Sequence, residues 1–161
     1  MQYRRIAVLA GARSTTGRDR QAGYLQALQA RGLAPLTCWL QPTVDSGRTA
    51  TQDLLNAETP PDAVLATNGL LLLGAAQAVQ SAGLRMPDDI GLAGFDNNDW
   101  TTLPAVDVTV VEQPTYDIGR TAAELLLQRL NEPARPARCV VLEGRLVVRG
   151  STRRAAAEAT A

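Results

Sequence analysis

Histidine and lysine are both absent from this sequence of 161 residues, and all 16 of its basic residues are arginine. The chain therefore lacks the side chains for a Ser-His-Asp triad, a histidine-ligated metal, a phosphate-binding loop lysine or Schiff-base chemistry. A pair of carboxylates or an activated cysteine remains open. A binding protein loses nothing by this composition, because arginine, asparagine and aspartate are good hydrogen-bonding residues.

Cysteines and long apolar runs are also scarce. Cys38 and Cys139 each lie in a strand-like apolar run, and we expect both to be reduced thiols in the core. No Cys-x-x-Cys motif or His/Cys cluster predicts a metal site. No run approaches the roughly 20 apolar residues that span a bilayer. The N-terminal apolar run is shorter than the ~7–15 residues of a signal-peptide core, so we expect a cytoplasmic protein without a membrane partner.

Net charge is balanced, with 16 arginines against 16 acidic residues. This balance argues against a chain that grips nucleic acid through its phosphates. The first apolar run is followed by Gly11 and Gly17 but by no Gly-x-Gly-x-x-Gly fingerprint, which disfavours a dinucleotide cofactor. The composition indicates no cofactor of another kind.

Apolar strand-like runs alternate with helical patterns along the chain. The expected strands are residues 5–10, 36–40, 62–66, 89–95 and 106–111, with a further strand-rich segment over 138–148. The expected helices are residues 17–31, a helix capped by Ser46 that runs to Leu55, residues 69–82 and residues 114–131. Alternating strands and helices predict an α/β fold, in which helices cover both faces of a mostly parallel sheet.

Polar residues follow three of these strands. They include Arg20 in the region after the first strand, Asn68 after the third and Asp96 after the fourth. Because parallel strands share a direction, these residues should converge on one edge, where open parallel sheets bind ligands. An arginine fork, an amide, a carboxylate and the nearby Trp100 suit a polyhydroxylated ligand. Each residue also has an ordinary structural explanation, as a turn or helix cap, a solvated charge or core packing.

Five segments in order resemble one family. They are IAVLAG with RQAGY (residues 6–11 and 20–24), PDAVLATN (61–68), PDDIGLAGFD (87–96), TVVEQP (109–114) and LVVRGST (146–152). Together they resemble the lactose/galactose-repressor (LacI/GalR) transcription regulators over about residues 4–152. The resemblance implies a periplasmic-binding-protein type I-like sandwich of three layers that binds a small effector, often a sugar.

The resemblance also implies site residues. Family effector contacts fall on Arg20, Asn68 and Asp96, and Gln113 is a fourth candidate near a crossover between two subdomains. The chain departs from the family at Gly69, where aspartate often follows the asparagine. That departure removes an acidic side chain and should loosen the start of the helix.

A complete family member begins with a helix-turn-helix DNA-binding domain and half of the effector domain. We therefore interpret residues 1–152 as the C-terminal part of an incomplete effector domain, with a disordered tail over 153–161. DNA would be bound only through the missing N-terminal domain. The family packs the helix over residues 114–131 in the other subdomain, so we expect Ile118, Leu125 and Leu126 to be under-buried here.

Residues 70–73 form a run of four leucines at a helix start. Four consecutive positions sweep about 300° around a helix, so they cannot all face one sheet. A deeply buried helix would explain the run. The alternative is a subunit interface, and because the family dimerises through this region we expect a homodimer that uses Leu70, Leu71, Leu72 and Leu73.

The leading hypothesis is the effector-binding portion of a transcriptional regulator. Arg13 and Arg18 beside Arg20 suggest an anionic effector such as a sugar acid. The stretches GFDNNDW and EQPTYDIGR resemble regulators of gluconate-type sugar acids, which implies an effector of that type. A sugar-binding protein of a transport system is the second hypothesis. The third is an enzyme that uses the Asp96 and Asp99 carboxylates as acid and base, which needs one raised pKa.

Overall fold

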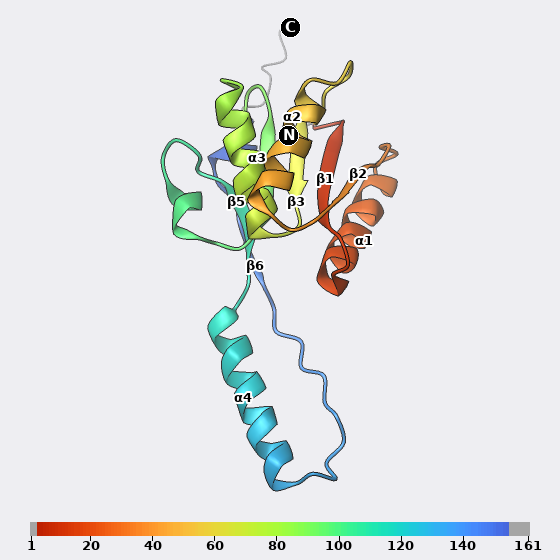
Figure 1. The fold of residues 1–161 in the computed structure, drawn as a ribbon, viewed down its shortest axis with the longest axis vertical. Helices are drawn as coiled ribbons and strands as arrows, with labels where there is room; N and C mark the ends of the chain where they lie inside the picture. The colour runs from red at the N-terminus through yellow and green to blue at the C-terminus, as the bar shows by residue number, and fades with distance from the viewer. Residues whose placement is uncertain (1–2, 155–161) are drawn as a thin grey trace, which may run out of the picture.

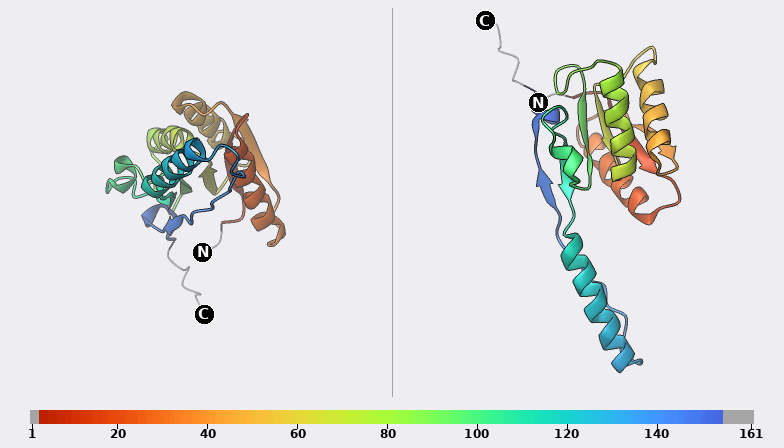
Figure 2. Two further views of the ribbon diagram at one scale, coloured as in Figure 1. Left: turned by 90° about the horizontal axis from the view of Figure 1, so that it is seen from below. Right: turned by 60° about the vertical axis from the view of Figure 1, so that its left-hand side comes forward.

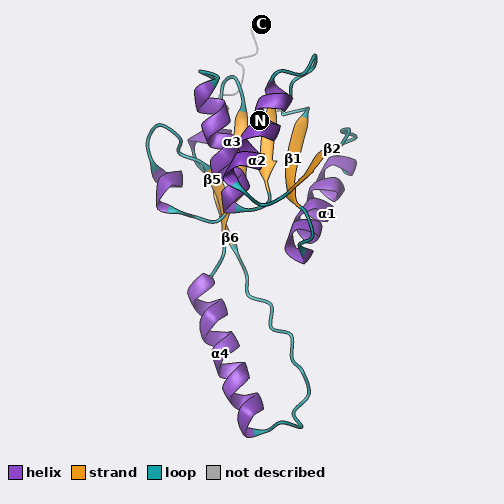
Figure 3. Cartoon of the chain, viewed as in Figure 1, coloured by secondary structure: helices purple, strands orange, loops and turns teal. Residues whose placement is uncertain are grey.

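A computed structural model of the chain describes residues 3–154 and shows an α/β fold around a single six-stranded sheet (Figures 1 and 3). The strands are β1 (Ile6–Gly11), β2 (Leu36–Leu40), β3 (Ala63–Ala66), β4 (Gly91–Phe95), β5 (Thr109–Glu112) and β6 (Arg145–Val147). The helices are α1 (Thr15–Gln29), α2 (Val44–Leu55), α3 (Gly69–Ser81) and α4 (Thr115–Asn131), with short 3-10 turns η1 (Asp99–Thr102) and η2 (Gly150–Thr152). No helix within residues 3–154 is long and apolar enough to cross a membrane.

The strand order across the sheet is β2-β1-β3-β4-β5-β6. The first five strands are parallel and β6 pairs antiparallel with β5. Next to the β2 edge of the sheet, Val8 of β1 lies opposite Thr37 of β2 on one side and Leu65 of β3 on the other. The predicted α/β fold with a mostly parallel sheet is confirmed, and the loops after β1, β3, β4 and β5 share one edge.

Helices cover both faces of the sheet, which makes three layers (Figure 2). Leu9, Val64 and Leu92 pack against α2 and α3 on one face. Val8 packs against Tyr24 and Leu28 of α1 on the other. The alternation of Val8 and Leu9 between two cores explains why β1 is apolar at successive positions, as expected of a strand buried on both faces.

Side-chain caps set the helix starts. The Ser14 hydroxyl accepts from the Gly17 amide at 3.2 Å, and Asn68 caps α3. The predicted Ser46 cap is wrong: the cap is Thr43, three residues earlier, so α2 begins at Val44, and the Thr43 hydroxyl accepts from the Ser46 amide at 3.2 Å. Either hydroxyl is a good cap, so the residue with extended backbone, here Thr43, takes the role.

The two helices on the larger core face touch backbone to backbone. A Cβ built on Gly74 of α3 would lie 2.1 Å from the Val44 carbonyl oxygen, and one on Gly47 of α2 would lie 2.6 Å from the Leu71 carbonyl oxygen. Such an approach is open only to glycine. It holds α3 against α2 and fixes where the start of α3 meets the edge of the sheet.

The segment over residues 138–148 differs from its prediction. Only Arg145–Val147 is a strand, because residues 138–144 run beside α4 without a neighbouring strand to pair with. Cys139 in this segment is exposed, so its predicted place in the core is wrong, whereas Cys38 in β2 is half-buried.

Residues 155–161 of the predicted disordered tail lie outside the described residues. The predicted disorder is wrong for the first two residues of the tail. The Arg153 guanidinium donates to the Val148 carbonyl oxygen at 3.0 Å, and Arg154 also has defined contacts. Its guanidinium lies 4.7 Å from the centre of the Tyr3 ring and donates to the carbonyl oxygens of Pro87 and Asp88.

Helix α4 projects away from the sheet together with residues 132–144 (Figures 1 and 2). None of its residues is buried, and Ile118, Leu126, Leu127 and Leu130 are exposed. Leu125 is half-buried. The predicted under-burial of this helix is confirmed. Residues 135–138 border Leu125 and Leu126, but they leave the apolar face of this amphipathic helix without a buried residue.

We expect α4 to exchange its amide hydrogens far faster than the sheet when the chain is studied alone. A helix without tertiary packing is marginally stable in water, so local opening exposes its amides without global unfolding. Hydrogen exchange followed by mass spectrometry should show rapid labelling over residues 115–131. Peptides from β1 and β3 serve as the slow internal reference. Protection of α4 equal to that of β1 would contradict the prediction.

Candidate functional site

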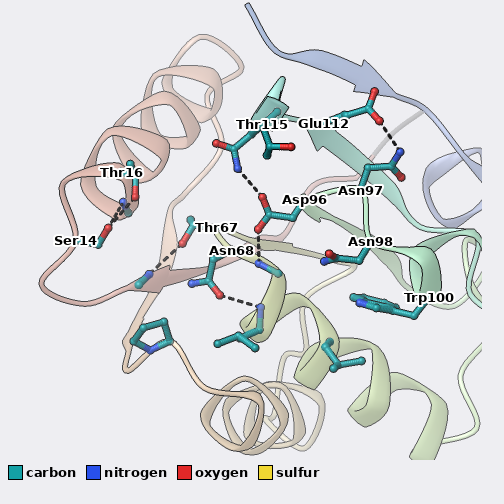
Figure 4. Close-up of a pocket in the computed structure, with 17 residues that line it drawn as sticks. Ser14, Thr16, Thr67, Asn68, Asp96, Asn97, Asn98, Trp100, Glu112 and Thr115 are labelled. Carbon is teal, nitrogen blue, oxygen red and sulfur yellow. Dashed lines mark hydrogen bonds between the residues drawn. The ribbon is translucent and has the colours of Figure 1, made fainter. Parts of the chain in front are cut away.

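A cavity of about 650 Å³ opens at the carboxyl edge of the parallel strands (Figure 4). Its wall comes from the loops after β1, β2, β3, β4 and β5 and from the first turn of α3. The lining residues are Gly11, Ser14, Thr16, Gly17, Pro42, Thr67, Asn68, Gly69, Leu70, Leu73, Asp96, Asn97, Asn98, Trp100, Glu112, Gln113 and Thr115. Four of the five predicted effector-binding residues are among them, and Arg20 is not.

Asn68 ends the loop after β3 and begins α3. Its side-chain oxygen accepts from the amides of Leu70 at 3.1 Å and Leu71 at 3.0 Å, so the helix-start interpretation of this residue is confirmed. Its side-chain nitrogen makes no hydrogen bond to any residue that the structure describes. The cap therefore fixes the Asn68 amide and leaves one donor group for a ligand.

Asp96 follows β4 with a positive φ of 76°, a conformation that aspartate tolerates better than most residues. One carboxylate oxygen accepts from the Gly69 amide at 3.0 Å, and the other accepts from the Gln113 side-chain amide. The start of α3 is therefore fully bonded through Asp96 and Asn68. The expectation that Gly69 loosens this helix start is wrong.

Arg20 does not line the cavity, but it hydrogen-bonds to two residues that do. Its guanidinium donates to the Thr67 carbonyl oxygen at 2.6 Å and to the Gln113 side-chain oxygen at 3.0 Å. It also lies 3.9 Å from the centre of the Phe95 ring. Burial lowers the pKa of Arg20 from its ordinary value, and the nearby Asp96 charge opposes that change. Arg20, Gln113 and Asp96 thus form one hydrogen-bonded chain.

Two neighbouring arginines take no part in this arrangement. Arg13 and Arg18 are exposed and neither lines the cavity. The charged side chains of the wall are instead two carboxylates, Asp96 and Glu112.

Trp100 lies on η1, half-buried, and forms the apolar side of the cavity with Leu70, Leu73 and Pro42.

The leucine run over residues 70–73 divides between two environments. Leu71 and Leu72 are 0% exposed, whereas Leu70 is 52% exposed. The predicted role of Leu71 and Leu72 in a dimer interface is wrong, because both side chains are enclosed in the core. Leu70 and Leu73 lie three residues apart on one helix face and remain candidates for the predicted dimer interface.

A second polar network at the rim was missed by reasoning from the sequence. The Asn97 amide donates to Glu112 at 2.7 Å, and Arg145 donates to the same carboxylate at 2.6 Å and 3.0 Å. Arg149 donates to the Asn97 side-chain oxygen at 2.6 Å. The Asn97 hydrogen bond and then Arg145 hold the pKa of Glu112 below its ordinary value.

The rule that ligands bind beyond the carboxyl ends of parallel strands, applied to β2 and β5 as well, would have predicted part of this network and of the cavity wall. Glu112 is the last residue of β5 and Pro42 lies just after β2. Arg145 and Arg149 were out of its reach, because the antiparallel pairing of β6 brings them to the rim. Within residues 3–154 no group of three or more metal-binding side chains is assembled.

Comparison with known proteins shows the family of this chain. A family model described as "Periplasmic binding protein-like domain" matches residues 2–152. The "HTH-type transcriptional repressor CytR" of Escherichia coli (strain K12) is 34% identical over 137 residues, which are 83% of this chain and 40% of that protein. The "HTH-type transcriptional regulator CelR" of Thermobifida fusca is 36% identical over 154 residues, which are 92% of this chain and 45% of that protein.

A solved structure described as a "transcriptional regulator CelR-cellobiose complex" superposes with a TM-score of 0.85 at 35% identity. The match covers 92% of this chain and 47% of that one. The chain thus spans less than half the length of these relatives. With the family model, the two regulators and the matching fold in agreement, this chain belongs to the periplasmic binding protein-like domain family, in the form found as the effector-binding domain of LacI-family transcriptional regulators.

Proposed function

We propose that this chain is part of a transcriptional regulator, in which it binds a small sugar or sugar acid and thereby controls DNA binding by a helix-turn-helix domain of the complete protein. It would supply the C-terminal part of the effector domain. The share of each relative that it matches supports this assignment. The effector would act by binding two subdomain arrangements unequally, because a ligand shifts an equilibrium only through such a difference.

The observation that carries the proposal is the fixed position of Asp96 in the cavity wall. Its carboxylate is held by the Gly69 amide and by Gln113, and the free amide group of Asn68 lies in the same wall. A preorganised acceptor and donor on one wall suit vicinal hydroxyl groups, and Trp100 offers an apolar face for a sugar ring. The cavity volume lies in the usual range for small-molecule sites, about 300–1,000 Å³.

The charge of the ligand is the finer part of the proposal. The described wall carries Asp96 and Glu112 and no arginine. Glu112 is compensated by Arg145, whereas among residues 3–154 Asp96 forms no direct ion pair, although Arg20 lies near enough for their charges to interact. This half of the site therefore favours hydroxyl donors near Asp96. A sugar acid of the gluconate type would place its carboxylate away from this wall.

Assembly and location follow from the same proposal. We propose a homodimer that acts in the cytoplasm, where it meets DNA. Leu70 and Leu73 are the predicted interface residues that are not enclosed in the core, and both also line the cavity. Gln113 lies one residue before Pro114, which precedes α4, so contact with an effector there would be next to the connection into the projecting helix.

The alternative functions have weaker support. A transport-associated binding protein would share the fold, but the relatives named above are transcriptional regulators and not enzymes or transport proteins. An acid–base role for Asp96 and Asp99 would need a carboxylate that is free to exchange protons. Asp96 is instead engaged as an acceptor on both oxygens.

Isothermal titration of the full-length regulator with glucose, cellobiose and gluconate tests the proposal. We expect at least one compound to bind and to raise the melting temperature, because a ligand at 100 times its Kd adds about 2.7 kcal/mol of stability. Recovery of the ligand unchanged would support binding over turnover. Absence of heat and of any thermal shift with folded protein, across an extended panel of sugars and sugar acids, would contradict it.

A further inference from the structure

Gly69 lies where the cavity wall meets the start of α3, between two of the proposed effector contacts, Asn68 and Asp96. A Cβ built on Gly69 would lie 3.1 Å from an Asp96 carboxylate oxygen, 3.1 Å from the Asn98 side-chain nitrogen and 3.4 Å from the Asp96 Cβ. Contacts of 3.0–3.4 Å are tighter than ordinary van der Waals contact, so the neighbouring atoms would have to shift by a few tenths of an ångström. The bare backbone at Gly69 is therefore what lets both side chains lie against the helix.

Asp96 has little freedom to move aside. One oxygen is held by the Gly69 amide at 3.0 Å and the other by Gln113, which Arg20 holds in turn. A side chain at position 69 would require Asp96 and Asn98 to shift by a few tenths of an ångström. The spacing between the Asp96 carboxylate and the Asn68 amide would change, while the Asn68 cap would remain.

We propose that Gly69 is a specificity-determining residue of the effector pocket. The missing side chain sets the position of the Asp96 carboxylate relative to the Asn68 donor, and so sets which arrangement of hydroxyl groups fits. This inference rests on the proposed function of the site. Gly69 would act without contacting the ligand, because the lack of a Cβ lets neighbouring groups approach its backbone closely.

The backbone conformation of Gly69 makes it possible to distinguish a role in specificity from a purely structural role. Its φ is not among the positive values of this chain, so alanine fits the local conformation. Alanine also favours a helix more than glycine does. Gly69→Ala should therefore keep the melting temperature or raise it by a few degrees, even though it displaces Asp96. Gly23 in α1 is the matched control, because a Cβ there meets nothing within 4 Å.

The experiment measures glucose, cellobiose and gluconate binding by titration calorimetry in the full-length regulator, with Gly69→Ala and Gly23→Ala beside the unchanged protein. We expect Gly69→Ala to weaken binding of the tightest-binding compound by about 10-fold or more, which is about 1.4 kcal/mol, or to change the order of the three affinities. The reason is that the substitution shifts Asp96, a proposed hydrogen-bonding group of the site. Gly23→Ala should leave all affinities unchanged.

Three results would overturn the inference. Unchanged affinities and ranking in Gly69→Ala would show that the Asp96 position does not depend on Gly69. A fall in melting temperature of more than about 5 °C, beyond the roughly 2–4 °C that 1 kcal/mol produces in a domain of this size, would assign Gly69 to packing alone. Failure of the unchanged protein to bind any compound of an extended sugar panel would reject the proposed function itself, and that result is distinguishable because it appears before any substitution.

Discussion

Arg20→Ala is expected to weaken effector binding by about 100-fold or more and to abolish the regulatory response. The substitution removes the donors to the Thr67 carbonyl and to Gln113, and with them the support of the Asp96 carboxylate. Each buried hydrogen-bonding group left without its partner costs about 1–3 kcal/mol. Two such losses total about 2–6 kcal/mol, and the 100-fold loss of affinity expected here corresponds to about 2.8 kcal/mol within that range. Titration calorimetry on the full-length protein would measure it.

Two further variants show whether the effect belongs to the guanidinium. Arg18→Ala removes an exposed arginine of the same helix and should leave binding unchanged. Arg20→Lys keeps the charge but loses the planar fork that reaches both acceptors, so it should recover only a small part of the affinity. A retained response in Arg20→Ala would remove Arg20 from the site and would leave Asp96 and Gln113 to act alone.

Leu72→Ala is expected to lower the free energy of unfolding by about 3 kcal/mol, within the range of 2–5 kcal/mol for a fully buried leucine. The side chain is 0% exposed and packs over Gly94 of β4, where an added Cβ would lie 2.7 Å from the two Leu72 methyl carbons. Because the space beneath Leu72 is bounded by backbone, little can collapse into the cavity. Urea unfolding of the chain would measure the change.

The matched control is Leu70→Ala, two positions away in the same helix. Leu70 is 52% exposed, so its truncation should change stability by no more than about 0.5 kcal/mol. Equal losses for Leu70→Ala and Leu72→Ala would contradict the division of the leucine run between core and cavity rim.

The convergence of the proposed effector residues was accessible from the sequence. Apolar runs that alternate with helical patterns predicted a parallel sheet, and the polar residues after its strands had to share an edge. Asn68 and Asp96 lie there, and Arg20 reaches the same edge from α1. The exposed apolar face of α4 was also foreseen, since the resembled family packs this helix against a subdomain that does not match this chain.

The tertiary structure decided how these residues are used. The pattern and spacing of apolar residues predict which helix or strand a residue belongs to and which loops share an edge of the sheet, because both depend on local chain geometry. They do not show that Arg20 acts behind the wall, that Leu71 and Leu72 are core while Leu70 is exposed, or that Cys139 is exposed. Those outcomes depend on which neighbour occupies each direction around a helix or strand, and the packing of residues far apart in the sequence sets that.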